Sequence, residues 1–598
     1  MQETDKAGAA VEGGASGAWS MAPSTTAEHL LLLLGAYGVE HLFLNPGTDS
    51  APIQEAAFAL AEAGAPIPAI VGSTFESVAL AAAHGYFQVT GRPQCVFVHV
   101  DSGTQNLGAM LHNAYRDGAG VVIMAGRTPY GEDKDALGGR SHPIHWQQDV
   151  ADQPGIVRGY TKWALEVVDP SVLSRAVGRA VQLATSAPAG PCYLTISRDV
   201  LMKRPDLASG RVGRFAVPSL PALDAQALRA LGAELARSER AVLITSRAGR
   251  SPAGFATLAA LAERAGVWVA EGGESRSLNV ATDHRWRVRS AGALKAALEG
   301  ADLVLVVDCD VPWVPMQVEP GAGARVLQID PEPTKVSMPL WSFPVDVSLK
   351  ADAETALAQL LGTVERAGEH APELAEACER RRARRREGPW FTDRSIPKQE
   401  PAAGQSAIRA GLSPEEVMAG LNEVLRPEDL VVEEAVTNRG VVREHLVRTR
   451  PGTLHGAGAP GLGWALGGAL GVKLASPLRR VVSICGDGSF LFAVPTSALT
   501  MAAALELPFL VVVLNNGGYR ASRLPVYDLF PDGHSVAAGT AIGTRFDMPP
   551  DLVALARACH AHGERVETAK ELPEALERAF GAMDSGRVAL LDVLVDQD

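Results

Sequence analysis

Residues 481–519 read VVSICGDGSFLFAVPTSALTMAAALELPFLVVVLNNGGY, and this stretch decides the fold. An apolar strand is expected at 481–485, then a Gly-Asp-Gly-Ser turn, a helix rich in Ala and Leu that ends near 507, and a second apolar strand at 509–514. That strand breaks at two asparagines and two glycines. Because parallel strands joined by a helix end at the same edge of their sheet, Asp487 and Asn516 are expected to face one crevice.

The ligands expected at this crevice suit a magnesium diphosphate. Mg²⁺ usually takes only one or two carboxylates and completes its shell with phosphate oxygens and water, which matches one Asp and one Asn. The glycines let the backbone approach closely, and the amides of Gly488 and Ser489 at a helix start can hold an anion. For either half of the motif alone, the simpler interpretation is structural: an Asp that caps a helix, and an Asn in a turn.

The two halves together resemble the signature of the thiamine-diphosphate enzymes, which is Gly-Asp-Gly followed at a distance by Asn-Asn. Here the matching residues are Gly486-Asp487-Gly488 and Asn515-Asn516. The resemblance implies thiamine diphosphate and Mg²⁺ as cofactors. It implies that the metal is held by Asp487, Asn516 and the carbonyl of Gly518. The other cofactor contacts that it implies on this stretch are Gly486, Gly488, Ser489 and Tyr519.

The rest of the chain fits an α/β enzyme made of several domains. Strands alternate with helices in three units, which predicts doubly wound, mostly parallel sheets. The expected divisions are a disordered lead at 1–22, a pyrimidine-binding domain at 23–204, a central domain at 218–362, a charged linker at 363–410 and a diphosphate-binding domain at 411–598. The functional names of the first and third domains come from the resemblance. A basic run at 380–386 is expected to be a solvated helix face within the linker.

The composition narrows the kinds of binding partner and the cellular compartment that we expect for this protein. The net charge of -13 argues against nucleic acid as the main partner. Six single cysteines without a C-x-x-C pair indicate neither a disulfide framework nor a zinc site, and suit a reducing cytoplasm. No apolar run approaches the length of a membrane span, and the first residues lack the basic start and apolar core of a signal peptide. We therefore expect a soluble, cytoplasmic protein.

Glu76 is the best candidate for an activating acid in the first domain. It follows an expected strand at 69–71 and opens a helix rich in Ala, Val and Leu. In the family that this chain resembles, a glutamate at this point meets the aminopyrimidine ring of the cofactor, before a helix that continues to a Gly-Tyr pair, here Gly85-Tyr86. Without the metal motif, a glutamate that is favoured at a helix start by the helix dipole would be the better explanation.

Two further segments resemble the benzoylformate-decarboxylase branch and the related acetolactate-synthase-like proteins. Asn45-Pro46-Gly47-Thr48 matches a turn whose hydroxyl residue touches the substrate carboxylate, which implies that role for Thr48. His99 begins a His-x-x-x-Gly-Thr-x-Asn run that ends at Asn106 and matches the active-site histidine of the branch. A histidine that titrates near neutrality can carry protons during the reaction, although a single histidine is more often part of a core.

In the third domain the resemblance implies three more cofactor contacts. Thr437 lies in the segment 434–438, which matches the first diphosphate-contacting segment. Leu462 falls where a bulky apolar side chain bends the cofactor, and the carbonyl of Pro460 is expected to accept a hydrogen bond from its amine. Leu462 would serve equally well as an ordinary core leucine.

The chain also departs from the branch. A second active-site histidine, which comes from the central domain, has no match, and His284 is a candidate by location only. Arg127 stands where acetolactate synthases commonly have Gln. A long loop at 129–154 carries Arg140, His142, His145 and Trp146, and is expected either to be functional or to pack on a neighbouring subunit. Arg520 and Arg523 are expected near the mouth of the cleft, where one could pair with a second carboxylate of the substrate.

These observations predict a thiamine-diphosphate- and Mg²⁺-dependent C–C lyase that decarboxylates a 2-oxo acid, with transfer of the remaining acyl unit to a proton or to a second carbonyl. The resemblance implies a homodimer or homotetramer whose sites are shared between subunits. Two alternatives stay open: a carboligase of the acetolactate-synthase type, and a cofactor-binding homologue without turnover. A flavin in the central domain and the identity of the 2-oxo acid also stay open.

Overall fold

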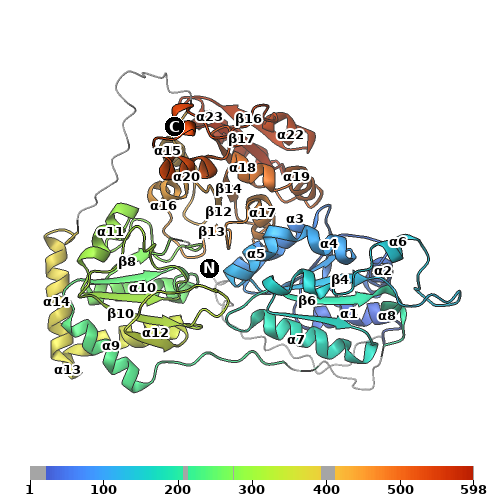
Figure 1. Ribbon diagram of the computed structural model, residues 1–598, viewed down its shortest axis with the longest axis horizontal. Helices are drawn as coiled ribbons and strands as arrows, with labels where there is room; N and C mark the ends of the chain where they lie inside the picture. Colours follow the sequence, from blue (N-terminus) through green and yellow to red (C-terminus); the bar gives the residue numbers. More distant parts are fainter. Residues whose placement is uncertain (1–21, 206–212, 214, 274, 392–410, 597–598) are drawn as a thin grey trace.

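The chain folds into three α/β units, each built on one parallel sheet. The computed structural model describes residues 22–205, 213, 215–273, 275–391 and 411–596. Figure 1 shows the units at the corners of a triangle, with the first (blue to teal), the central (green to yellow) and the third (orange to red) meeting near the middle. The predicted fold class, three parallel-sheet α/β domains, is confirmed. The lead predicted at 1–22 lies, except for residue 22, outside the described residues.

The first domain has a six-stranded sheet in the order β2-β1-β3-β4-β6-β5. Its strands are β1 His41–Leu44, β2 Ala69–Gly72, β3 Gln94–Val98, β4 Val121–Arg127, β5 Trp163–Val167 and β6 Cys192–Ser197. Its helices are α1 Thr26–Ala36, α2 Ala51–Glu62, α3 Glu76–Thr90, α4 Val100–Asn106, α5 Gly108–Asp117, α6 Ile144–Gln147, α7 Leu173–Thr185 and α8 Arg198–Met202. Short 3₁₀ turns occur at Pro154–Ile156, Arg158–Tyr160 and Pro170–Val172.

The central domain has a five-stranded sheet in the order β11-β10-β9-β7-β8. Its strands are β7 Ala241–Thr245, β8 Trp268–Glu271, β9 Leu303–Val307, β10 Arg325–Asp330 and β11 Val347–Lys350. Its helices are α9 Ala225–Arg237, α10 Pro252–Ala265, α11 Ala291–Gly300, α12 Ala353–Glu365, α13 Ala367–His370 and α14 Pro372–Arg386.

The prediction of a charged linker at 363–410 is wrong for the part that the structure describes. Helix α14 packs on the central domain, because Leu374 and Cys378, one helical turn apart, enter its core, and Ala377 beside them is also buried. Arg381, in the run expected to be solvated, is buried and donates hydrogen bonds to the carbonyls of Leu235, Ser238 and Ala265. Residues 392–410 lie outside the described residues.

The third domain has a six-stranded sheet in the order β13-β12-β14-β15-β17-β16. Its strands are β12 Leu430–Glu434, β13 Leu454–Gly456, β14 Val481–Gly486, β15 Leu510–Asn515, β16 His562–Val566 and β17 Ala589–Leu594. Its helices are α15 Pro414–Val424, α16 Arg439–His445, α17 Trp464–Ala475, α18 Asp487–Phe492, α19 Pro495–Ala504, α20 Arg520–Leu529, α21 His534–Ala537, α22 Leu552–Ala558 and α23 Leu572–Asp584.

The crossover between β14 and β15 corrects one expectation. The sequence predicted a single helix that ends near 507, but the structure has two, α18 and α19, separated at Val494. Val494 takes a left-handed conformation with φ +47°. The next residue, Pro495, has no N–H to donate and starts α19, a position where proline fits a helix.

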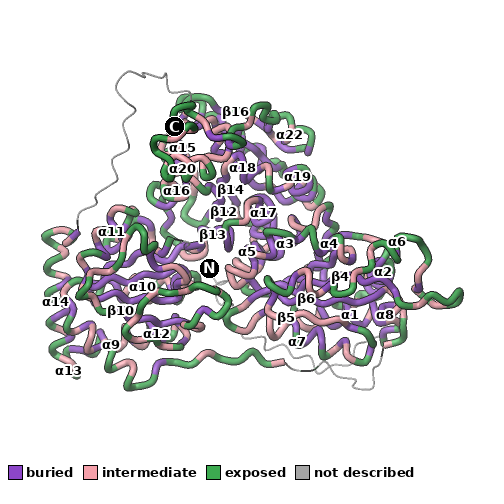
Figure 2. The backbone as a smooth tube through the Cα atoms, viewed as in Figure 1, coloured by how far each residue is buried: buried purple, intermediate pink, exposed green. Residues whose placement is uncertain are grey.

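One apolar core joins the first and third domains, where α3 crosses α17. The two helix backbones approach closely because small residues line the crossing. A Cβ atom added at Gly467 would lie 2.6 Å from the Cβ of Ala81, and one added at Gly471 would lie 1.9 Å from the carbonyl oxygen of Ala82. Figure 2 shows the sheet interiors of all three units as buried. Among the described residues, no helix combines the length and the apolar character needed to cross a bilayer.

Candidate functional site

The ends of β14 and β15 lie side by side in the third domain. The two strands pair in parallel, with Gly486 opposite Leu514, so the residues that follow each strand emerge at one edge of the sheet. Asp487 opens α18, and its carboxylate accepts hydrogen bonds from the N–H groups of Gly488 at 2.8 Å and Gly518 at 2.9 Å. Asp487 thus bridges the two strand ends.

Asp487 is a buried carboxylate without a cationic partner in the described part of the chain. Burial raises its pKa to about 6, against the opposing effect of backbone N–H donors. Among the described residues, no group of three or more His, Cys, Asp or Glu side chains is arranged so that it could hold a metal ion. A donor set of one carboxylate plus amide and carbonyl oxygens therefore fits Mg²⁺ bound together with phosphate oxygens, and does not fit a site built from protein carboxylates alone.

The two asparagines at the end of β15 differ in their surroundings. Asn515 donates from Nδ2 to Asp592 at 2.7 Å and accepts from the N–H of Gly517, so its side chain is used within the domain. Asn516 is half-buried and comes next along the chain. Gly517 has φ +77°, a left-handed conformation that favours glycine, and this turn brings Gly518 back to Asp487.

The ring of Tyr519 lies close to Gly488 in the Gly-Asp-Gly turn. A Cβ atom at Gly488 would lie 2.8 Å from the Tyr519 ring, whereas one at Gly486 would meet open space. The hydroxyl of Ser489 already donates to the carbonyl of Glu434 at 3.0 Å. Its backbone N–H, rather than its hydroxyl, is therefore the group that Ser489 can offer to an anion.

Glu434 fixes the segment that contains Leu462. Its buried carboxylate accepts from the N–H groups of Gly463, Trp464 and Ala465, the start of α17, at 2.9 to 3.2 Å. Burial raises the pKa of Glu434 to about 7. Leu462, just before this start, is only half-buried and lies outside the apolar cores, so it is not the ordinary core leucine that the sequence also allowed.

The neighbouring residues of that segment contact the first domain or the solvent. Asn113 of α5 holds Gly461 from both sides, since its Nδ2 donates to the carbonyl of Gly461 at 2.7 Å and its Oδ1 accepts from the N–H at 3.1 Å. Pro460 is exposed and Thr437 is half-buried. Sequence reasoning did not identify Asn113, because its contact joins residues that are far apart in the chain.

Glu76 is the first residue of α3, as expected, and is half-buried. Its Oε2 accepts from Nδ2 of Asn106 at 3.1 Å. Gly103 lies against the other carboxylate oxygen, because a Cβ atom there would be 3.0 Å from Oε1. The carboxylate is thus confined between α3 and α4.

His99 comes just after β3 and pairs with Asp49, a residue that sequence reasoning missed. Nδ1 of His99 lies 2.5 Å from Oδ1 of Asp49, while Oδ2 accepts from the N–H of Val100 at 3.3 Å. This hydrogen bond raises the pKa of His99, against the effect of burial. Asp49 directly follows Thr48, and the motif around Thr48 gave no signal for it beyond its position in the turn.

Thr48 lies close to the long loop at 129–154. Its hydroxyl is 3.5 Å from Nε2 of His145 in α6, and its carbonyl accepts from Nη1 of Arg198 at 3.1 Å. His284, the candidate for a second histidine in the central domain, lies 3.6 Å from Glu263 instead.

The predicted site residues form two separate sets within one chain. Thr48, Glu76 and His99 have their polar contacts in the first domain, whereas Asp487, Gly488, Ser489 and Gly518 have theirs in the third. Among the described residues, no hydrogen bond or ion pair joins the two sets. We refer to the two sets as the first-domain half-site and the third-domain half-site.

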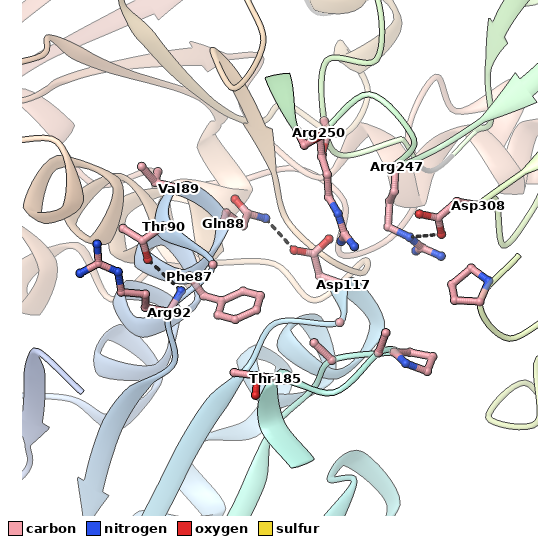
Figure 3. Close-up of a pocket in the computed structure, with 18 of the residues that line it drawn as sticks. Phe87, Gln88, Val89, Thr90, Arg92, Asp117, Thr185, Arg247, Arg250 and Asp308 are labelled. Atoms are coloured by element: carbon pink, nitrogen blue, oxygen red, sulfur yellow. Dashed lines mark hydrogen bonds and ion pairs between the residues drawn. The ribbon is translucent and has the colours of Figure 1, made fainter. Parts of the chain in front are cut away.

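A cavity of about 1240 Å³ lies elsewhere, between the first domain, the central domain and residues 452–455 (Figure 3). None of the predicted site residues lines it. At its central-domain wall, Arg247 pairs with Asp308 and Asp310, and Lys335 pairs with Asp310 and Asp330. These ion pairs lie at the carboxyl ends of β7, β9 and β10.

Comparisons with known proteins match the two domains that carry these residues. Residues 24–156 match the N-terminal TPP binding domain of thiamine pyrophosphate enzymes, and residues 436–593 match the C-terminal TPP binding domain. The chain is 28% identical to a benzoylformate decarboxylase of Pseudomonas aeruginosa, over 92% of this chain and 95% of that one. It is 27% identical to a probable acetolactate synthase of Mycobacterium bovis, over 88% and 89%.

A solved structure shares the fold. The thiamine diphosphate-dependent 4-hydroxybenzoylformate decarboxylase of Rhodococcus jostii superposes with a TM-score of 0.74 at 23% identity, and the match covers 96% of this chain and all (100%) of that one. The arrangement of three parallel-sheet domains is therefore common to both proteins.

Proposed function

Because the chain belongs to the thiamine pyrophosphate enzymes, we propose that it is a thiamine-diphosphate- and Mg²⁺-dependent lyase that decarboxylates a 2-oxo acid. The observation that carries this proposal is the group formed by Thr48, Asp49 and His99. His99 has its pKa raised by the carboxylate of Asp49, and Asp49 directly follows Thr48, the hydroxyl donor, in the same turn. A donor for an acid substrate and a group that carries protons are what such a reaction requires of the protein.

The third domain supplies the residues that would hold the cofactor. Asp487, Asn516 and the carbonyl of Gly518 would bind Mg²⁺, and the burial of Asp487 without a cationic partner in the described residues supports this assignment. The diphosphate would be met by Gly486, Gly488, Ser489, Thr437 and Tyr519. Leu462 would support the bent form of the cofactor, and the Pro460 carbonyl would accept from its amine.

When bound, thiamine diphosphate supplies a carbon nucleophile for the carbonyl and accepts the electron pair released with CO₂. The protein moves the protons. Glu76 would exchange a proton with the aminopyrimidine ring, and Asn106 holds its carboxylate in place. His99, oriented through Nδ1 by Asp49, would act as the proton donor. Thr48 would donate to the substrate carboxylate.

Two subunits would complete each site. In one chain the set around Glu76 and the set around Asp487 share no hydrogen bond among the described residues, so we propose a homodimer or a dimer of dimers in which the first domain of one subunit faces the third domain of another. A second fate of the acyl unit, transfer to a carbonyl acceptor, belongs to the proposal because of the likeness to a probable acetolactate synthase.

A substrate screen tests this function. The protein, with thiamine diphosphate and Mg²⁺, is assayed for CO₂ release from aliphatic, aromatic and acidic 2-oxo acids, and the products are identified with and without added aldehyde. We expect CO₂ release from at least one class, lost by a factor of about 10² or more in Glu76→Gln, the range of acid–base catalysis. Equal rates in the wild type and Glu76→Gln, or no turnover of any 2-oxo acid, would refute the proposal.

A further inference from the structure

The loop at 129–154 brings a second histidine to the first-domain half-site. His145 is buried, and its two ring nitrogens have different neighbours. Nδ1 accepts from the backbone N–H of Ser141 at 3.1 Å, whereas Nε2 lies 3.5 Å from Oγ1 of Thr48. Because a backbone N–H can only donate, Nδ1 carries no proton, and the neutral ring has its proton on Nε2.

This tautomer determines which way the Thr48 hydroxyl can point. With Nε2–H donating to Oγ1, the hydroxyl hydrogen of Thr48 must find another acceptor. In the part of the chain that the structure describes, no protein oxygen accepts from Oγ1, and Thr48 is exposed at the end of its turn. The hydroxyl hydrogen is therefore available to a ligand.

Two arginines hold the loop in this position. Arg198 of α8 donates to the carbonyls of Gly138 and Gly139, at 3.0 and 2.5 Å, and to the carbonyl of Thr48. Arg140 donates to the carbonyl of His145 at 2.9 Å and pairs with Asp149. Arg198 thus links the loop to the backbone of Thr48, and His145 of the loop contacts the side chain of Thr48.

The charges around the two histidines favour different protonation states. Burial lowers the pKa of His145, and the nearby Arg198, His142, Arg140 and His99 lower it further. Asp49 raises the pKa of His99, helped by Asp101. Two titratable groups whose pKa values are pushed apart can take different roles in one site, here a proton carrier and a neutral donor.

We propose that His145 is the second histidine of this site, a positioning residue that turns the Thr48 hydroxyl toward the carboxylate of the 2-oxo acid. The inference rests on the proposed function, since that function supplies the carboxylate. The histidine then comes from a loop of the first domain, and His284, which lies against Glu263, has no part in it.

A double-mutant cycle tests whether His145 acts through Thr48. On the best 2-oxo acid, we expect Thr48→Ala and His145→Ala each to raise KM about tenfold, the range for a hydrogen bond to a charged group, with kcat changed much less. The double variant should match Thr48→Ala alone, because the two residues serve one contact. His145→Gln, which keeps an N–H donor, should recover most of the affinity, and Gln147→Ala, exposed on the same helix, should resemble the wild type.

Two results would overturn the inference while the proposed function stands. One is a double variant whose KM rises by the product of the two single effects. The other is a ¹⁵N spectrum of histidine-labelled protein, with the His145 signals assigned by their loss in His145→Gln, that shows a protonated Nδ1 at neutral pH; we expect Nδ1 to be unprotonated. Failure of the proposed function differs from both, because the wild type itself would then turn over no 2-oxo acid.

Discussion

At the scale of single residues, the most informative group is the Asp487 carboxylate. Its pKa of about 6 lies above the ordinary aspartate value of 3.8, so the folded protein without metal binds this proton more tightly than the unfolded chain does. The stability contributed by that protonation is fully present below about pH 4 and is lost as the pH rises through about 6. A bound cation would offset the loss, because it stabilises the charged carboxylate.

The direction of this pH dependence leads to a prediction about metal binding. Mg²⁺ with thiamine diphosphate should raise the Tm more at about pH 7.5 than at about pH 5, because only the ionised carboxylate binds the cation. Differential scanning calorimetry at both pH values measures the two shifts. Asp487→Asn should lose most of the shift at both, and an undiminished shift in this variant would remove Asp487 from the metal site.

A second prediction concerns the pair of Asp49 and His99. Asp49 raises the pKa of His99, so Asp49→Asn should move that pKa toward its ordinary value and lower the pH at which the proton-donating form is lost. The alkaline limb of the kcat profile should therefore shift to lower pH. Asp152→Asn, an exposed carboxylate paired with Arg158, is the control. An unshifted limb would mean that His99 does not set it.

Residues at strand ends were the part of the site that the sequence could predict. Glu76, His99 and Asp487 are each placed at the start of a helix after a strand, and the parallel pattern of apolar strands is enough to locate them. Asp49 and His145 were not predicted as site residues, because their importance depends on contacts 50 and 97 residues away in the chain. Local patterns carry no information about such pairs.

At the scale of elements, the crossing of α3 and α17 decides how the first and third domains are joined. The helices meet through glycine and alanine, so their separation is set by the backbones themselves. Helix α3 starts at Glu76, and α17 starts just after Leu462. The crossing therefore fixes the positions of the first-domain and third-domain half-sites relative to each other within one chain.

We predict that Gly471→Ala destabilises the protein by about 1–3 kcal/mol, the usual cost of overpacking a core. The added Cβ atom would lie 1.9 Å from the carbonyl oxygen of Ala82 in α3, which forces the helices apart. Gly581→Ala in α23 is a matched control, since a Cβ atom there meets nothing within 4 Å and alanine favours a helix. Thermal unfolding of both variants measures the effect, and equal Tm values would contradict it.

Helix α14 shows where element prediction from sequence fails. Its many charges indicated a linker, yet three apolar residues on one face and the buried Arg381 attach it to the central domain. A helix with a mostly charged composition can still have a narrow apolar face, because such a face needs only a few residues. The break between α18 and α19 was missed for a related reason, since residues rich in Ala, Leu and Phe lie on both sides of Pro495 and suggested one continuous helix.

At the scale of the whole molecule, the three-domain architecture could be predicted because alternating strands and helices are a strong pattern and the metal motif falls on one crossover. The proposed sharing of sites between subunits could not be derived from the chain, because a sequence does not show which domains of two subunits face each other. The proposed function therefore requires that the two half-sites of one active site come from different subunits.

Complementation between two inactive variants tests that assignment most directly. Glu76→Gln removes the first-domain half-site and Asp487→Asn removes the third-domain half-site, so each variant alone should be inactive. When the two are co-expressed with separate tags and the mixed oligomers form at random, one site in each mixed dimer has both residues intact, and decarboxylation should return to about a quarter of the wild-type rate. Mixed oligomers that are isolated through both tags and remain inactive would contradict the account.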